Sequence, residues 1–159
     1  MITTSNAGSG GVGSYTVADL PAGVYTVTAA ALAGCGIDEP AIPGALHAAE
    51  HAAIGLLGLI ATCDRWDIGG VSTALHADTG LPTVLVYDGN PGGAGFAEQG
   101  FRRAAEWLTA TLETVRSCAC HAGCPSCVQS PKCGNGNNPL NKTGAVAVLS
   151  LMAEALAQD

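Results

Sequence analysis

The chain has 159 residues, enough for one domain with a sizeable buried core. Hydrophobic residues make up 48% of it but aromatic residues only 4%, so alanine, leucine and valine must fill the interior. The formal net charge of −7 argues against a protein that binds nucleic acid by itself. The N-terminus lacks the basic stretch and apolar core of a secretory signal, and no apolar run approaches the ~20 residues that span a bilayer. We therefore expect neither secretion nor a membrane partner.

Residues 1–23 form a polar, glycine-rich start, which predicts a flexible lead-in to a single domain at residues 24–157. Within that domain, β-branched residues at 24–30 favour a strand. Residues 44–61 are rich in alanine and leucine and predict a mostly buried helix that starts near Pro43. Its Gly55 and Gly58 would let a neighbouring element approach closely.

The second half of the domain predicts a hairpin followed by helices. Residues 71–76 and 82–87 are expected to be its strands, with Gly80 in the turn. An amphipathic pattern predicts a helix at 96–115, and an apolar pattern predicts a last helix at 142–157. The fold class is therefore α/β or α+β, with a small mixed sheet, three main helices and a cysteine-rich loop at 118–133.

Five of the seven cysteines lie in that loop, and four have the spacing C-x-C-x3-C-x2-C: Cys118, Cys120, Cys124 and Cys127. Four thiolates from one short loop suit a single tetrahedral zinc ion with a structural role. Cys133 follows six residues later and is an alternate fourth ligand. Disulfides are the competing interpretation, but a C-x-C bridge closes a very tight ring and an odd cysteine count leaves one thiol over. Zinc-type spacing without an export signal favours the reducing cytoplasm. Cys35 and Cys63 are expected to be small buried residues.

His47, Glu50 and His51 form the pattern H-x-x-E-H. On a helix the two imidazoles lie one turn apart on one face, with Glu50 beside them as a possible base, as in some zinc hydrolases. Such a site needs a third protein ligand, and the nearby sequence contains no carboxylate motif that would supply one. The alternative is a polar network in the helix seam, or a contact between domains that also involves Asp88.

Two loops leave further alternatives open. Residues 88–95, Asp-Gly-Asn-Pro-Gly-Gly-Ala-Gly, precede a predicted helix and could bind an anion, or could form a tight turn capped by Asp88. Residues 116–142 contain three basic and no acidic side chains. Lys132, Asn137 and Lys142 could there contact a nucleic-acid backbone, or could brace the zinc loop by hydrogen bonds, which is the favoured interpretation.

Several motifs taken in order resemble the C-terminal zinc-binding domain of mitomycin-repair-type DEAD/DEAH-box DNA helicases. They are Ala45-Leu-His-Ala-Ala-Glu-His51, Cys63-Asp-Arg-Trp-Asp-Ile-Gly-Gly70, Val86-Tyr-Asp-Gly-Asn-Pro-Gly-Gly-Ala-Gly95, the cysteine loop that continues to Asn137, and Leu140-Asn-Lys-x-x-Ala145. The resemblance implies one zinc ion held by Cys118, Cys120, Cys124 and Cys127, with Cys133 also on a family-like position.

The resemblance further implies an accessory role beside two RecA-like motor domains in DNA repair. The sequence contains neither a Walker A lysine loop nor a D-E-x-H box, so we expect a non-catalytic domain. It would be either the C-terminal portion of a split or truncated helicase or a stand-alone relative that works with a motor in trans. Its partners would be helicase motor domains in cis or in trans, and DNA together with the motor. Two alternatives are a small zinc hydrolase that uses His47, Glu50 and His51, and a redox-sensitive zinc module that uses residues 118–133.

Overall fold

A computed structural model describes residues 3–4, 24–26 and 28–157, so most of the predicted lead-in lies outside the described residues. An antiparallel sheet has the strand order β1-β2-β4-β3 and comprises β1 (Thr3–Thr4), β2 (Val24–Thr26), β3 (Ile68–Thr73) and β4 (Thr83–Asp88). β4 is the central long strand and β3 is the edge strand that pairs with it from Ile68 opposite Asp88 to Thr73 opposite Thr83. The sheet is therefore small, as the sequence predicts, but its strand pairs are antiparallel, so the described sheet is not mixed.

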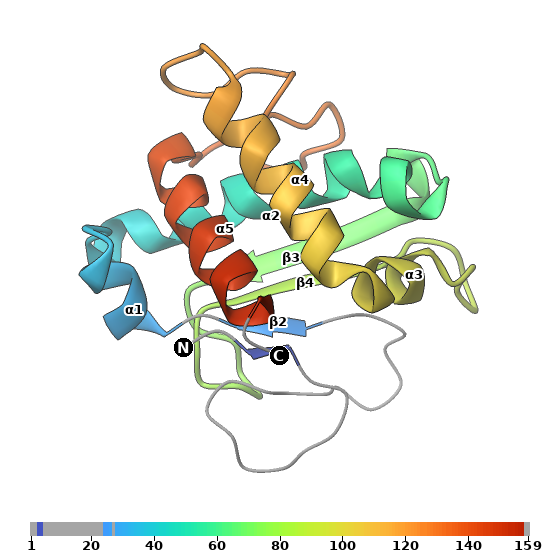
Figure 1. The fold of residues 1–159 in the computed structure, drawn as a ribbon, viewed down its shortest axis with the longest axis horizontal. Coiled ribbons are helices and arrows are strands. Elements are labelled where there is room, and N and C mark those ends of the chain that lie inside the picture. Colours follow the sequence, from blue (N-terminus) through green and yellow to red (C-terminus); the bar gives the residue numbers. More distant parts are fainter. Residues whose placement is uncertain (1–2, 5–23, 27, 158–159) are drawn as a thin grey trace.

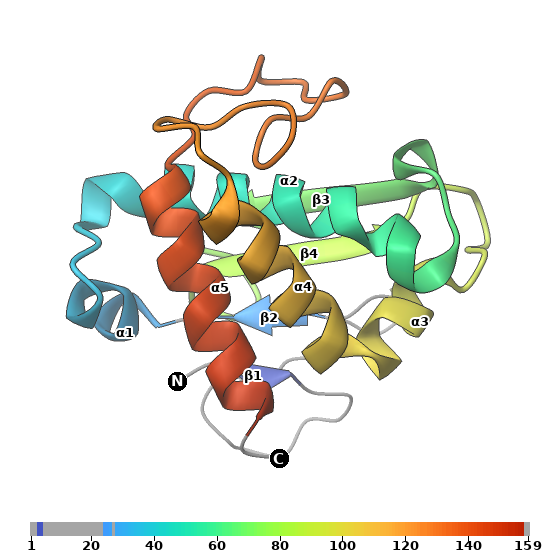
Figure 2. The ribbon, with the colours of Figure 1, turned by 45° about the horizontal axis from the view of Figure 1, so that its top comes forward.

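The helices pack against one side of this sheet, which gives an α+β domain (Figures 1 and 2). The helices are α1 (Ala29–Gly34), α2 (Ile42–Ala61), α3 (Phe96–Arg102), α4 (Ala104–Ser117) and α5 (Lys142–Leu156), with two short 3-10 helices at Glu39–Ala41 and Arg65–Asp67. Helix α2 contacts the strands β3 and β4 and the helices α4 and α5. The segment 118–141 joins α4 to α5 and lies over α2 (Figure 2).

Helix α2 is the centre of the core, because nearly every side chain from Ile42 to Ile54 is buried. By length and composition, residues Glu39–Ala61 could cross a membrane, but 78% of the relevant window is buried inside this domain, as in the core helix of a globular fold. Alanine dominates this helix, which lets α5 approach it closely. The closest approach is at Gly144, where an added Cβ would lie 2.5 Å from the Cβ of Ala45.

The close approach predicted at Gly55 and Gly58 is confirmed at Gly58 but not at Gly55. An added Cβ on Gly58 would lie 2.6 Å from the carbonyl oxygen of Cys63, so this glycine admits the chain as it turns back after α2. Gly55 has no atom closer than a guanidinium nitrogen of Arg65 at 3.6 Å. The glycines that permit helix packing are instead Gly44 and Gly144, which lie near the ends of α2 and α5 that meet.

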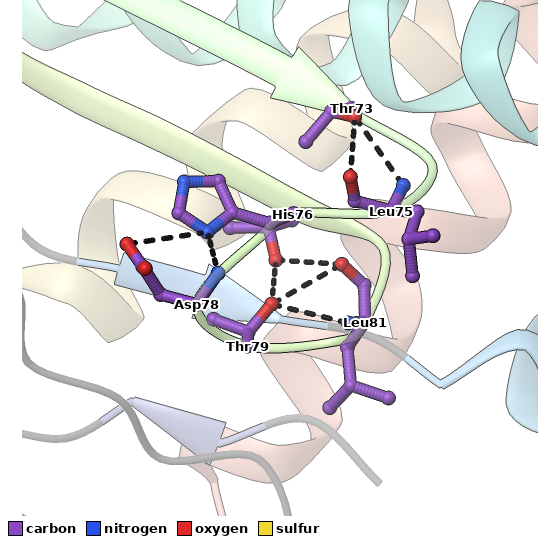
Figure 3. A network of polar contacts seen from close by, with 7 residues as sticks. Thr73, Leu75, His76, Asp78, Thr79 and Leu81 are labelled. Atoms are coloured by element: carbon purple, nitrogen blue, oxygen red, sulfur yellow. Dashed lines mark hydrogen bonds and ion pairs between the residues drawn. The ribbon is translucent and has the colours of Figure 1, made fainter.

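The β3–β4 connection is held by short-range hydrogen bonds (Figure 3). The Thr79 hydroxyl donates to the carbonyl of Leu81 at 3.2 Å, and the Leu81 amide donates back to it at 3.1 Å. Gly80 has a φ of +63°, the left-handed conformation that the turn requires, and its amide donates to the carbonyl of His76 at 2.8 Å. The hairpin is thus confirmed, with strands shifted by up to three residues from the predicted bounds.

Two predicted elements differ from the structure. The strand expected at 24–30 ends at Thr26, and Thr28 instead caps α1 by accepting the Ala31 amide at 3.0 Å. The helix expected at 96–115 is two helices, because Arg103 leaves helical geometry at φ −114° and ψ 31°. Its guanidinium donates to the carbonyl of Ile60 at 2.7 Å, which ties this break to the end of α2.

We predict that Gly144→Ala lowers the free energy of unfolding by about 1–3 kcal/mol, because the new methyl group overlaps Ala45 and forces α5 away from α2. Urea denaturation followed by circular dichroism measures the change. Gly34→Ala is the matched control, since nothing lies within 4 Å of the added Cβ there and α1 is already helical. Equal stabilities of the two variants would contradict close packing at Gly144.

Candidate metal sites

The four predicted zinc cysteines come together at the start of the α4–α5 connection. The sulfur atoms of Cys118, Cys120, Cys124 and Cys127 lie within 4.8 Å of one another. Four of the sulfur pairs are 3.4–3.7 Å apart. A zinc–sulfur bond of roughly 2.3 Å implies tetrahedron edges of about 3.8 Å, whereas a disulfide needs sulfurs about 2 Å apart. All seven cysteines are free thiols, so the cluster fits one metal ion and does not fit disulfides.

Backbone geometry in this loop is built around the sulfurs. The Cys124 amide donates to the sulfur of Cys127 at 3.3 Å, which stabilises negative charge on that sulfur. Gly123 has a φ of +112°, and an added Cβ there would lie 2.5 Å from a methyl group of Val128. The ammonium of Lys142, at the start of α5, donates to the carbonyls of Cys118 at 2.5 Å and Cys120 at 2.7 Å. The loop is therefore fixed by its own backbone and by the start of α5.

Two of the four thiols, Cys120 and Cys127, have shifted pKa values. Burial raises the pKa of Cys127 to about 12, and the neighbouring thiols act in the same direction. Burial also tends to raise the pKa of Cys120, but hydrogen bonds from Cys127, Cys118 and Cys124 outweigh it and lower that pKa to about 7. Thiolates this close repel one another, so they ionise together only around a cation. A divalent ion that accepts soft sulfur ligands satisfies this requirement.

Cys133 lies apart from those four sulfurs, beside the histidines of α2. Its sulfur is 3.4 Å from Nε2 of His47, and the ligand atoms of His47, His51 and Cys133 all lie within 4.8 Å of one another. His47 donates from Nδ1 to the carbonyl of Pro139, and His51 donates from Nδ1 to the carbonyl of Val128, each at 2.9 Å. The H-x-x-E-H pattern is thus turned toward the α4–α5 connection. Sequence separations of 77 to 92 residues hide these contacts from any local motif.

Lys132, Asn137 and Lys142 all hydrogen-bond the polypeptide itself. The amide side chain of Asn137 accepts from the Ser130 amide at 2.7 Å and donates to the Ser130 carbonyl at 3.0 Å. The ammonium of Lys132 donates to the carbonyl of Ile68 on the edge strand β3. These contacts hold residues 130–139 in place, and a role of the same side chains toward nucleic acid stays a prediction.

A cavity of about 530 Å³ lies between this connection, α2 and β3, and both histidines, Glu50 and Cys133 line it. Burial raises the pKa of Glu50, although Ser72 and the positive side chains nearby act against the rise. Burial also lowers the pKa of His51, which favours the neutral ring. The glycine pair 69–70 makes room here, because an added Cβ on Gly70 would lie 2.7 Å from a carboxylate oxygen of Glu50. This cavity was not predicted from the sequence. Two adjacent glycines within a strand can indicate a close approach by another group, and Gly69 and Gly70 were the available signal.

Asp88 lies at the end of β4 and caps the next helix. One carboxylate oxygen accepts from the amides of Ala94 at 2.7 Å and Gly95 at 2.6 Å, and the other accepts from Ala97 at 2.8 Å. The amides that could have held an anion are therefore occupied by Asp88, and the capped-turn interpretation is confirmed. Cys35, in contrast, is exposed, so the prediction of a buried residue there is wrong, and Cys63 is half-buried.

The chain is similar in sequence to a zinc-binding domain family, to a small protein and to part of a helicase. The sequence model of the MrfA Zn-binding domain family matches residues 49–128. An uncharacterized protein of Methanocaldococcus jannaschii is 37% identical over 109 residues, and the match covers 65% of this chain and 96% of that protein. The ATP-dependent helicase YprA of Bacillus subtilis is 47% identical over 66 residues, which cover 42% of this chain but 9% of the helicase.

Among solved structures, the crystal structure of the DUF1998 helicase MrfA bound to DNA superposes with a TM-score of 0.63 and 27% sequence identity. The match covers 84% of this chain and 16% of the helicase. The chain therefore spans almost all of the archaeal relative, but a small part of each of these helicases.

We predict that Asp88→Ala destabilises the domain by about 2–3 kcal/mol, because three amides just before and within the first turn of α3 lose a charged acceptor. Thermal unfolding measures the loss, and hydrogen exchange should show it first at residues 94–97. Asp38→Ala serves as control, since the Asp38 side chain makes no capping hydrogen bond. An Asp88 variant as stable as the Asp38 variant would contradict the capping role.

Proposed function

This chain belongs to the MrfA Zn-binding domain family, and on that basis we propose that it is a non-catalytic, zinc-binding accessory domain of a DNA-repair superfamily 2 helicase system. The single observation that carries the proposal is the cluster of four cysteine sulfurs at tetrahedral spacing within a fold shared with a DNA-bound helicase. The motor would act in cis or in trans, and the domain would work in the cytoplasm.

The zinc ligands in this proposal are Cys118, Cys120, Cys124 and Cys127. When bound, the ion supplies cross-linking and not Lewis-acid chemistry, since four thiolates complete its coordination shell and leave no position for a substrate. The protein residues do the remaining work: Lys142 ties the loop to α5, and the Cys124 amide supports the sulfur of Cys127. The ion would thus fix a loop that contains neither helix nor strand among residues 118–141.

The charge distribution supports a partner-dependent role toward DNA. The whole chain carries a net charge of −7, and the three basic residues at 116–142 would be opposed by the formal charge of a zinc–tetrathiolate centre. Lys132 and Lys142 also already donate to backbone carbonyls. A motor domain would therefore provide most of the phosphate contacts, and this domain would shape the DNA path beside it.

We predict that Cys124→Ser loses the cluster-bound zinc and lowers the free energy of unfolding by about 3 kcal/mol or more. The measurements are zinc content of reduced, purified protein and urea denaturation. Cys35→Ser is the matched control, because Cys35 is exposed and lies outside the cluster. Full zinc retention and unchanged stability in the Cys124 variant would contradict the assignment.

A chimaera tests the accessory role itself. In the helicase MrfA, the segment that matches this chain is replaced by the corresponding residues of this chain, and ATP-dependent DNA unwinding is measured. We expect the chimaera to unwind DNA, the same chimaera with Cys124→Ser to lose most of that activity, and the chimaera with Cys35→Ser to keep it. The isolated chain should bind short DNA only weakly in fluorescence anisotropy, with a Kd above about 1 μM at physiological salt. Tight binding by the isolated chain, or equal unwinding by both cysteine variants, would refute the proposal.

A further inference from the structure

A second group of metal-ligand atoms lies outside the four-cysteine cluster. It consists of Nε2 of His47, a ring nitrogen of His51 and the sulfur of Cys133, all within 4.8 Å of one another. We propose that these three residues bind a second zinc ion. The proposal goes beyond the accessory function, because it concerns different residues and neither depends on the other.

The orientation of the two imidazoles carries the first step of the argument. A backbone carbonyl can only accept a hydrogen bond, so the contacts of Nδ1 with Pro139 and Val128 place a proton on Nδ1 of both His47 and His51. In the neutral ring this leaves the lone pair on Nε2, which is the atom of His47 that faces Cys133. Zinc-bound histidines commonly donate their other nitrogen to a carbonyl in this way.

The sulfur of Cys133 also accepts a hydrogen bond from a backbone amide. The Asn137 amide donates to it at 3.2 Å, as the Cys124 amide donates to Cys127 in the first cluster at 3.3 Å. Asn137 holds the required left-handed conformation at φ +61°, and its side chain clamps Ser130 on the other side of the turn. The loop thus directs one amide at this sulfur by the same device that serves a zinc-binding cysteine.

The distances fit a tetrahedral ion. Zinc bonds of roughly 2.3 Å to sulfur and 2.0–2.1 Å to nitrogen imply a nitrogen–sulfur separation of about 3.6 Å. The observed separation between Nε2 of His47 and the sulfur of Cys133 is 3.4 Å. His47 and His51 are one helical turn apart, with ring centroids 4.3 Å apart, so both rings can face one ion.

The site is also accessible. His47, His51 and Cys133 line the cavity of about 530 Å³, so an ion can enter and a water molecule can occupy the fourth position. Glu50 lines the same cavity and is not among the three ligands. The third ligand that H-x-x-E-H lacks in the sequence is thus Cys133. Two histidines and one thiolate suit zinc better than magnesium or calcium, which prefer oxygen ligands.

Zinc titration of the reduced chain tests the proposal. The metal is first removed by a chelator, and bound zinc is then counted after gel filtration. We expect about two zinc ions per chain for the wild type, and about one for Cys133→Ser and for His51→Gln. Cys35→Ser and His121→Ala are the matched controls, since both side chains are exposed and outside either group, and should retain both ions.

The ion that remains in the Cys133 and His51 variants reports that the first cluster is still folded, and two different variants protect the test against misfolding of one. X-ray absorption on Cys124→Ser should in turn show a remaining zinc with nitrogen and sulfur ligands. One zinc in the wild type, or two in the wild type and in both the Cys133 and His51 variants, would overturn the second site. Retention of zinc at the first cluster in Cys124→Ser would refute the proposed function instead.

Discussion

The packing of polar side chains on α2 against the α4–α5 connection is the interaction on which the rest of the structure depends. His47, Glu50 and His51 are each at most 9% exposed, and burying them without partners would cost several kcal/mol. The connection at 118–141 has no helix or strand and equally needs partners for its backbone. The histidines meet both needs, since each ring donates to a carbonyl of the connection. Helix α2 and the connection thus supply hydrogen-bond partners for each other's buried polar groups.

Two kinds of contact then define the loop. Local ones gather the four sulfurs, through the Gly123 conformation and the Cys124 amide. Long-range ones orient the whole loop on the helices: the Asn141 amide donates to the Gly44 carbonyl at 3.0 Å, and Lys142 reaches the two cysteine carbonyls. An ion in the four-cysteine cluster adds to the local set but cannot orient the loop on the helices. The long-range contacts therefore explain why α5 must lie so close to α2.

The sequence predicts the features that depend on residues close together in the chain. It does not predict those that depend on contacts between residues far apart in the chain. Four cysteines within ten residues have to meet, so the first cluster was predictable from spacing alone, as was the capping by Asp88. The pairing of Cys133 with His47 spans 86 residues and follows only from how the loop folds back over α2. The break at Arg103 is equally tertiary, since its guanidinium reaches the end of α2. Nothing in the sequence distinguishes Gly44 and Gly144 from other helix glycines, and their role in packing α2 against α5 is visible only in the structure.

The edge strand β3 connects these features to the sheet. An exposed edge strand offers unpaired backbone groups, and here Lys132 from the loop covers the carbonyl of Ile68. Gly69 and Gly70 have no side chains, so the Tyr87 ring can lie against the backbone of Gly69 and the Glu50 carboxylate against that of Gly70. The cavity exists because the loop bridges from α2 to this strand without filling the space between them. A movement of residues 130–139 would therefore open the strand edge and separate Cys133 from His47 together, which couples the order of the loop to the geometry of the three-ligand group.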